Sequence, residues 1–305
     1  GPVLDLQGVV NRFGRNGVLR GLDLSIASHE VVVLLGASGS GKSTLLRTAN
    51  LLERVDDGQI FLSGADITDP RIDVDAVRAR IGVVFQHYNL FPHLSVLDNI
   101  TLAARKVHGI ARDAAETRGK ELLERIGLSD KAAAFPDRLS GGQQQRIRFA
   151  IATMHDPNIL ILDEPTTGMD VTARRTFWER MDKLAETGKT IIFATHYLEE
   201  AQNFAQRIVL MDNGKIIADG TSEEIRDLTG GRHVSFLADK PITFSEYPML
   251  SVETSEENGA YRHRTTVANA DEFARVLLTK YTVRDLEIVK PSLDESFVQL
   301  TDRAA

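Results

Sequence analysis

The 305-residue sequence contains no cysteine, so it can form neither a disulfide nor a thiolate metal site. Its uninterrupted apolar runs, such as residues 31–35 and 159–162, are far shorter than the roughly 20 residues that cross a bilayer. Acidic residues outnumber basic ones by 43 to 36, which leaves no basic excess for neutralising nucleic-acid phosphates. No basic start precedes a long apolar stretch, so we expect no secretory signal peptide. These absences favour a globular protein of a reducing compartment, without a membrane span and without DNA or RNA as partner.

The chain has an ordinary globular composition, with 42% hydrophobic and 26% charged residues. Its length is too great for one typical core and suggests one large domain and one small domain. Residues 31–35 are apolar on both faces, as expected of a strand buried in a parallel sheet. Three similar runs alternate with helical stretches, at residues 81–85, 159–162 and 190–194. We therefore predict a mostly parallel α/β sheet that binds ligands at the carboxyl ends of its strands.

Three other regions differ from this parallel core. Short apolar runs interrupted by glycines over residues 3–26 predict antiparallel strands. The segment of about residues 94–150 is mainly helical and is expected to form a separate lobe. We place the large domain at residues 1–230 and a small α+β accessory domain at residues 231–305. The accessory domain is predicted from strands at 233–238, 250–254 and 261–267, a helix with Phe273, Val276 and Leu277 on one face, and a final helix with a capping box of Ser292 and Glu295.

A glycine-rich segment between a buried strand and a helical pattern carries the first functional signal. It fits the pattern of a phosphate-binding loop and consists of Gly36, Ala37, Ser38, Gly39, Ser40, Gly41, Lys42, Ser43 and Thr44. Glycines let the backbone turn its N–H groups toward phosphate oxygens, and the following helix presents its positive end. Lys42 is suited to bridge the β- and γ-phosphates of a nucleotide and Ser43 to bind Mg²⁺. The pattern predicts a nucleotide site rather than a flexible glycine turn.

Two carboxylates follow the apolar run 159–162. Asp163 stands at the predicted carboxyl end of that strand, where it can bind the metal, and Glu164 lies just beyond it. At that position a carboxylate can polarise a water molecule aimed at the γ-phosphate. Alone, such a pair is more typical of a solvated loop. Together with the phosphate loop upstream, it indicates nucleotide hydrolysis.

A second anion-binding helix start follows Leu139 and comprises Ser140, Gly141, Gly142 and Gln143. Here the sequence resembles the ATP-binding cassette (ABC) family, whose signature motif is LSGGQ. In that family each of two ATP molecules lies between the phosphate loop of one subunit and the signature of the other. The resemblance covers about residues 3–228. It implies the P-loop NTPase cassette fold, with a parallel core sheet, an antiparallel β subdomain and a helical subdomain.

The remaining landmarks of the family occur in the family order. Phe13 matches the aromatic residue that stacks on adenine, and Gln86 matches the glutamine that senses the metal and the attacking water. His196 matches the switch histidine that contacts the γ-phosphate, and residues 167–170 match the D-loop with altered wording. The resemblance therefore implies ATP and Mg²⁺ as cofactors. The metal ligands it implies are Ser43, Gln86 and Asp163.

The resemblance implies an ATP-hydrolysing subunit of an ABC transporter that forms a homodimer around two ATP molecules. It implies a separate integral membrane permease as partner and a cytoplasmic, peripheral position on the inner face of the cell membrane. The alternative is a soluble cassette ATPase that acts on nucleic acid or the ribosome. That alternative is disfavoured because no long coiled-coil heptads separate Thr44 from Leu139 and the chain has one cassette. A module that binds ATP without turnover is disfavoured by the presence of Glu164 and His196.

The family wording changes along the chain. About residues 35–148 resemble the ATPases of polar amino-acid importers, whereas the chain from about residue 151, including the accessory domain, resembles those of drug and polysaccharide exporters. Two origins fit this mosaic, a natural divergent cassette and an engineered chimera. The transported substrate, the direction of transport and the role of the accessory domain stay open. Outside the landmarks, we interpret Trp178 as helix packing and Glu199 and Glu200 as solvated charges.

Overall fold

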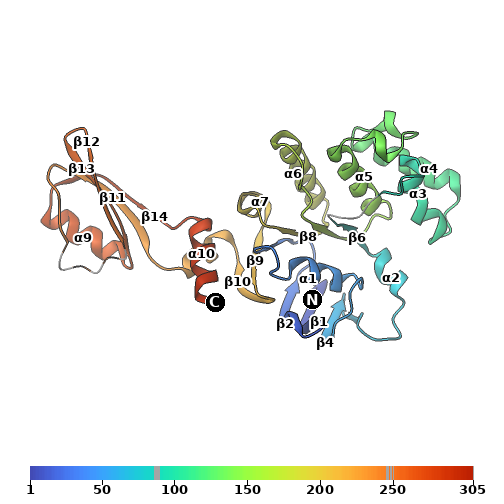
Figure 1. Ribbon diagram of the computed structural model, residues 1–305, viewed down its shortest axis with the longest axis horizontal. Coiled ribbons are helices and arrows are strands. Elements are labelled where there is room, and N and C mark those ends of the chain that lie inside the picture. The colour runs from blue at the N-terminus through green and yellow to red at the C-terminus, as the bar shows by residue number, and fades with distance from the viewer. Residues whose placement is uncertain (86–89, 245–246, 248, 250, 305) are drawn as a thin grey trace. The chain divides into compact units, whose positions relative to one another are not determined.

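The computed structural model of the chain describes residues 1–85, 90–244, 247, 249 and 251–304. Their contacts divide the chain into two compact units, Gly1–Asp219 and Gly220–Ala305 (Figure 1). The division falls earlier in the chain than residue 230. The reason is helix α8 (Ser222–Leu228), which packs against α10 (Leu293–Ala304) within the second unit.

A six-stranded sheet forms the centre of the first unit. Its strand order is β10-β9-β3-β8-β7-β6, and strands β6, β7, β8, β3 and β9 pair in parallel. The strands are β3 (Val31–Leu35), β6 (Ile81–Val84), β7 (Ile159–Asp163), β8 (Thr190–Thr195), β9 (Arg207–Asp212) and β10 (Lys215–Gly220). All residues of β3, β7 and β8 are buried, because helices and a second sheet cover both faces. The four predicted buried strands are confirmed, and β9 and β10 complete the sheet.

An antiparallel sheet of order β2-β1-β4-β5 accounts for the glycine-interrupted start of the chain. Its strands are β1 (Leu4–Phe13), β2 (Asn16–Ile26), β4 (Asp57–Leu62) and β5 (Ala65–Asp66). Helix α1 (Lys42–Ala49) buries Leu45 and Leu46 in one cluster with Leu4 of β1 and Val32 of β3. Helix α1 therefore joins the two sheets in a single core. The short helix α2 (Val74–Ala79) is capped by the carboxylate of Asp73 and precedes β6.

The helical lobe has a core of its own. It contains α3 (Val96–Lys106), α4 (Arg112–Arg125), α5 (Gly141–Thr153) and two short 3₁₀ turns, Ser129–Lys131 and Pro136–Arg138. Val96 and Ile100 of α3, Leu123 of α4 and Ile147 of α5 are buried against one another. These helices occupy the green segment of Figure 1. The predicted helical lobe is confirmed. Its core supports α5, the helix that follows Ser140.

Helices α6 (Val171–Glu186) and α7 (Leu198–Phe204) pack near strand β8. Trp178 of α6 is 1% exposed, with its ring 4.5 Å from that of Phe193 on β8 and 5.0 Å from that of Phe204 on α7. The interpretation of Trp178 as helix packing is confirmed.

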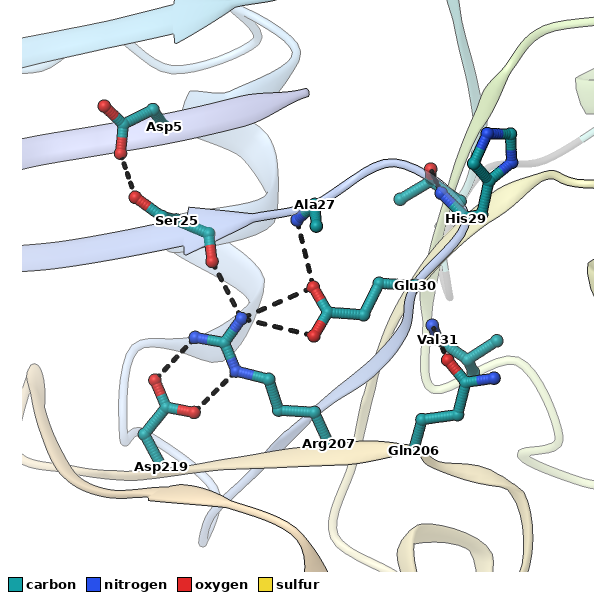
Figure 2. Close-up of polar contacts among 10 residues, drawn as sticks. Asp5, Ser25, Ala27, His29, Glu30, Val31, Gln206, Arg207 and Asp219 are labelled. Atoms are coloured by element: carbon teal, nitrogen blue, oxygen red, sulfur yellow. Dashed lines mark hydrogen bonds and ion pairs between the residues drawn. The ribbon is translucent and has the colours of Figure 1, made fainter. Parts of the chain in front are cut away.

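A branched polar contact ties both sheets of the first unit together at Arg207, the first residue of β9 (Figure 2). The guanidinium forms two bonds to the carboxylate of Asp219 on β10, at 2.6 and 2.7 Å, which raise the pKa of Arg207 above its ordinary value. It also donates to the carbonyl of Ser25 on β2 at 2.8 Å and lies 3.4 Å from the carboxylate of Glu30. One cation therefore links the end of β2, the entry to β3, and strands β9 and β10.

The second unit contains an antiparallel sheet of order β12-β13-β11-β14 with a helix packed on it. The elements are β11 (Arg232–Ala238), β12 (Ser251–Glu257), β13 (Ala260–Val267), α9 (Ala270–Lys280), β14 (Val283–Val289) and α10. Phe273 and Leu277 of α9 are buried against Val234 and Phe236 of β11. Strand β14 was not predicted, because its residues are mostly exposed and give no apolar alternation.

The final helix begins as the sequence predicts. The amide of Glu295 donates to the hydroxyl of Ser292 at 3.2 Å, and the amide of Ser292 donates to the carboxylate of Glu295 at 2.9 Å. These two bonds form the expected capping box. In the ranges that the structure describes, every helix is too short or too polar to span a membrane.

Candidate functional site

The phosphate loop joins β3 to α1 and has a backbone that only glycine permits at two positions. A Cβ atom at Gly36 would lie 2.5 Å from the carbonyl oxygen of Met211 and 2.6 Å from the hydroxyl oxygen of Ser40. Gly41, at the amino end of α1, has φ of 103°, a conformation that other residues rarely adopt. The close packing at Gly36 and the left-handed turn at Gly41 direct the chain from a buried strand straight into a helix. The loop amides and the helix N-terminus therefore surround one small space.

Lys42, the first residue of α1, is only 6% exposed. Its ammonium donates to the carbonyl oxygens of Gly36 at 2.7 Å and Ala37 at 3.0 Å. Burial lowers the pKa of Lys42, and the negative charges of Glu164 and Asp163 oppose that shift. The loop thus holds a cationic side chain within the field of two carboxylates.

The two carboxylates come from the carboxyl end of β7. Asp163 is 3% exposed, and the next residue, Glu164, has φ of 48° and donates its amide to the carbonyl of Ala194 on β8 at 2.9 Å. Because β7 and β8 run in parallel, the residues that follow them reach the same edge of the sheet. His196 follows β8, and its Nδ1 lies 2.9 Å from Oε2 of Glu164. An ionised carboxylate only accepts hydrogen bonds, so the imidazole is the donor of this contact.

A cavity of about 520 Å³ lies where these segments meet. Its size is that of a small-molecule site. The lining residues are Val18, Ala37, Ser38, Gly39, Gly41, Lys42, Ser43, Thr44, Glu164 and His196. The structure therefore brings the phosphate loop, the strand-end glutamate and the histidine together around one space. Val18 of β2 was missed, because an isolated valine in a strand carries no functional signal.

The oxygen atoms at this site fit a magnesium ion. Ser43 lines the cavity and carries a hydroxyl. The negative charge of Asp163 opposes the lowering of the pKa of the neighbouring Lys42, so its carboxylate lies close to the same place. Magnesium favours such hard oxygen ligands and usually takes only one or two from the protein, with the rest from water and phosphate. Across the described part of the chain, no group of three or more His, Cys, Asp or Glu side chains could hold a metal by itself. Gln86, the third expected ligand, lies outside the described residues.

The signature segment does not share this cavity. Ser140 caps α5, with its hydroxyl accepting from the amide of Gln143 at 3.2 Å and its own amide donating to the Gln143 side chain at 2.9 Å. Ser140, Gly141 and Gly142 line a different cavity, of about 540 Å³, which also borders α6. Phe13, at the hairpin between β1 and β2, is 84% exposed and lines neither cavity. Within one chain the two anion-binding helix starts therefore serve different spaces.

One residue near the site contradicts its sequence interpretation. Glu200, expected to be a solvated charge, is 2% exposed, whereas its neighbour Glu199 is exposed as expected. The carboxylate of Glu200 accepts hydrogen bonds from Thr166, Trp178 and Thr195. Those donors come from three separate segments, so no local sequence pattern could have revealed the contact.

Comparisons with known proteins agree with this geometry. The family model described as ABC transporter matches residues 19–167. The glutamine transport ATP-binding protein GlnQ of Escherichia coli (strain K12) is 40% identical over 221 residues, which cover 72% of this chain and 92% of the relative. The glutamate/aspartate import ATP-binding protein GltL of the same strain is 42% identical over 227 residues, covering 74% and 93%.

Solved structures show the same fold. A dimeric, post-hydrolysis state of the ATP-binding cassette MJ0796 bound to ADP and Pi matches with a TM-score of 0.65 and 30% identity, covering 72% of this chain and 98% of that chain. The cbiO1 protein from Clostridium perfringens, part of an ABC transporter complex, matches with a TM-score of 0.66 and 28% identity, covering 73% and 90%. Two relatives are thus at least 40% identical over nine tenths of their own length, and the phosphate loop, Glu164 and His196 surround one cavity. This chain therefore belongs to the ABC transporter family and is an ATP-binding, ATP-hydrolysing subunit.

Proposed function

We propose that the chain powers a polar amino-acid importer, as a homodimer with two ATP molecules at its interface and beneath a separate membrane permease. One observation carries the ATPase site, namely the cavity around which Lys42, Glu164 and His196 gather. The import direction is supported by the relatives, which are named for glutamine and for glutamate/aspartate transport. In this proposal the chain binds peripherally to the inner face of the cell membrane.

Each residue of the cavity has one task in this proposal. The amides of the phosphate loop and the ammonium of Lys42 bind the β- and γ-phosphates of ATP. Ser43 and Asp163 would hold Mg²⁺, with Gln86 as the third ligand that the family resemblance implies, and the ion would neutralise phosphate charge. The exposed ring of Phe13 offers a face for stacking on adenine.

Glu164 and His196 act on the hydrolytic water. The carboxylate of Glu164 accepts the proton of a water molecule directed at the γ-phosphate. The contact of 2.9 Å between Nδ1 of His196 and Oε2 of Glu164 restrains that carboxylate, and the imidazole lies in the cavity wall where it reaches the same phosphate. Hydrolysis then depends on holding water and phosphate in line.

The separation of the two anion-binding helix starts supports the proposed dimer. Ser140, Gly141 and Gly142 face a cavity other than the one at Lys42, so the signature of one chain is available to the phosphate loop of another. The dimeric state of the MJ0796 cassette bound to ADP and Pi supports a dimer of this kind of subunit. ATP then contributes contacts to both chains.

The test is to isolate the tagged chain from membranes, identify the integral protein that it retains and place the pair in lipid vesicles. Labelled glutamine, glutamate and arginine serve as substrates, and vesicles with Lys42→Ala serve as the control. The proposal expects ATP-dependent movement of one amino acid across the bilayer onto the side that carries the ATPase subunit and ATP. Movement away from the ATP side, or the absence of any retained integral protein, would overturn it.

A further inference from the structure

Glu200 of α7 is a buried carboxylate that the mechanism above does not use. The side chain of Glu200 is 2% exposed, whereas Glu199, the preceding residue of the same helix, is exposed. Helix α7 begins two residues after His196. Removing a carboxylate from water costs free energy unless hydrogen bonds and a nearby positive charge replace the solvent. The contacts of Glu200 therefore identify what the buried charge holds together.

Both oxygens of Glu200 accept hydrogen bonds. Oε1 accepts from the hydroxyl of Thr166 and from the indole N–H of Trp178, the latter at 3.1 Å. Oε2 accepts from the hydroxyl of Thr195 at 2.8 Å. The guanidinium Nε of Arg174 on α6 lies 3.8 Å from Oε1 and supplies the positive charge. The carboxylate is thus held by three hydrogen-bond donors and one nearby cation, which come from four different positions on the chain.

Two of these donors belong to the segments that carry the ATPase side chains. Thr166 is two residues beyond Glu164, and Thr195 directly precedes His196. Both threonines are buried, at 1% and 0% exposure, so their hydroxyls have no access to water as a substitute. One carboxylate therefore joins the loop after β7 to the last residue of β8.

Further contacts restrain the same two segments. The Arg174 guanidinium stacks over the ring of Tyr197 at 4.6 Å, and that ring lies 4.1 Å from the imidazole of His196. On the other loop, the side-chain amide of Gln145 on α5 donates to the carbonyl of Pro165 at 2.8 Å. Glu164 itself has φ of 48°, a left-handed conformation that is uncommon for a glutamate and persists only when its surroundings hold it.

We propose that Glu200 is a positioning residue for ATP hydrolysis, which holds Glu164 and His196 in contact through the hydroxyls of Thr166 and Thr195. It touches neither ATP nor the water, since the cavity wall does not include it. The inference rests on the roles proposed for Glu164 and His196. A displacement of about 1 Å at a reacting group can lower a rate by roughly 10²-fold, so losing this restraint acts on turnover more than on ATP binding.

The test compares Glu200→Gln with Glu199→Gln in the full-length chain. Glutamine keeps the size of the side chain but removes its negative charge, and its NH₂ group cannot accept a hydrogen bond. At least one of the three donors therefore loses its acceptor, and a threonine hydroxyl keeps a contact only by turning to accept from that NH₂ group. We expect kcat for ATP hydrolysis to fall about 10- to 100-fold in Glu200→Gln, with the Kd for ATP within about threefold of the parental value. The exposed Glu199→Gln variant controls for the loss of one negative charge in the same helical turn and should keep the parental kcat.

Single-arm variants keep the proposal testable if Glu200→Gln folds poorly. Thr166→Val and Thr195→Val each remove one hydroxyl with little change of shape, and each should lower kcat while leaving the Kd for ATP unchanged. A merely structural carboxylate would instead lower the melting temperature and weaken ATP binding together. Parental kcat in Glu200→Gln, or in both threonine variants, would overturn the proposal.

A double-mutant cycle separates this inference from the proposed catalytic roles. In a Glu164→Gln background, adding Glu200→Gln should lower the residual rate by less than threefold, because the restrained carboxylate is already gone. Fully additive losses would show that Glu200 acts elsewhere and would overturn the positioning role. A parental rate of ATP hydrolysis in Glu164→Gln alone would refute the general-base role of Glu164. That result comes from the single variant and is therefore distinct from a failure of the role of Glu200.

Discussion

Replacing Glu164 with glutamine tests the proposed chemistry most directly. Glutamine keeps the length and planar end of the side chain, so it can occupy the same space, which is 12% exposed for this side chain. Its carbonyl oxygen can still accept the hydrogen bond from Nδ1 of His196, where the present contact measures 2.9 Å. The backbone at φ of 48° carries the same strain with either residue. The substitution therefore removes the basic oxygen and little else.

The expected loss follows from the role of a general base. Removing such a group lowers a rate by roughly 10²- to 10⁴-fold. At about 1.36 kcal/mol for each factor of ten, this corresponds to about 3 to 5 kcal/mol of barrier. ATP binding should change little, because the contacts assigned to phosphate come from the loop amides and from Lys42. The ammonium of Lys42 is held by the carbonyls of Gly36 and Ala37 and not by a hydrogen bond to Glu164.

The assay pairs phosphate release with calorimetric ATP titration on the same preparation. Glu179→Gln, an exposed glutamate on α6, serves as the matched control and should keep the parental rate. A Glu164→Gln rate within threefold of the parental rate would mean that Glu164 is not the base. A variant that neither binds ATP nor unfolds at the parental temperature would mean that the residue is structural.

Three further outcomes are expected. Lys42→Ala should weaken ATP binding at least tenfold, because it removes the buried cation of the phosphate loop; unchanged affinity by calorimetry would count against that loop as the site. Glu164→Gln should double in mass by light scattering when ATP is added, and equal masses with and without ATP would argue against the ATP-closed dimer. In the second unit, Glu295→Ala should lower the free energy of unfolding by about 1 kcal/mol at pH 7, since the α10 capping box is lost. Hydrogen bonds from His233 and Ser292 lower the pKa of Glu295. The stabilisation is therefore present above the ordinary pKa of 4.5 and shrinks as the pH falls below that value. An equal difference in unfolding free energy between the parent and Glu295→Ala at pH 7 and at pH 4, measured by denaturant titration, would contradict the assignment.

Much of the architecture was readable from local pattern. Residues 31–35 and 159–162 are apolar on both faces, and the structure places them as β3 and β7 inside the parallel sheet. The capping box at Ser292 and Glu295 depends on two residues of one helical turn, so it was equally accessible. Strand β14 was missed because it is an exposed edge strand, and its place is set by pairing with β11.

The ATPase landmarks could also be found in advance, since each stands at a strand end or a helix start and is recognised by its immediate neighbours. No distance between these landmarks follows from the sequence. The parallel pairing of β7 with β8 brings Glu164 into contact with His196 at one edge of the sheet. The misreading of Glu200 has the same origin, because a glutamate beside another glutamate on a short helix has the local pattern of a solvated face.

The kind of fold, the order of the landmarks and the nucleotide chemistry are encoded locally, because glycine loops, apolar strands and helix caps are specified within a few residues. Which charged side chain is buried, and what it holds, depends instead on how distant segments pack. Thr166, Trp178 and Thr195 are distant in sequence, and their donors meet at Glu200 because the loop after β7, helix α6 and the end of β8 come together at α7. A buried charge is stable only where its partners converge, and that convergence is a property of the packed chain.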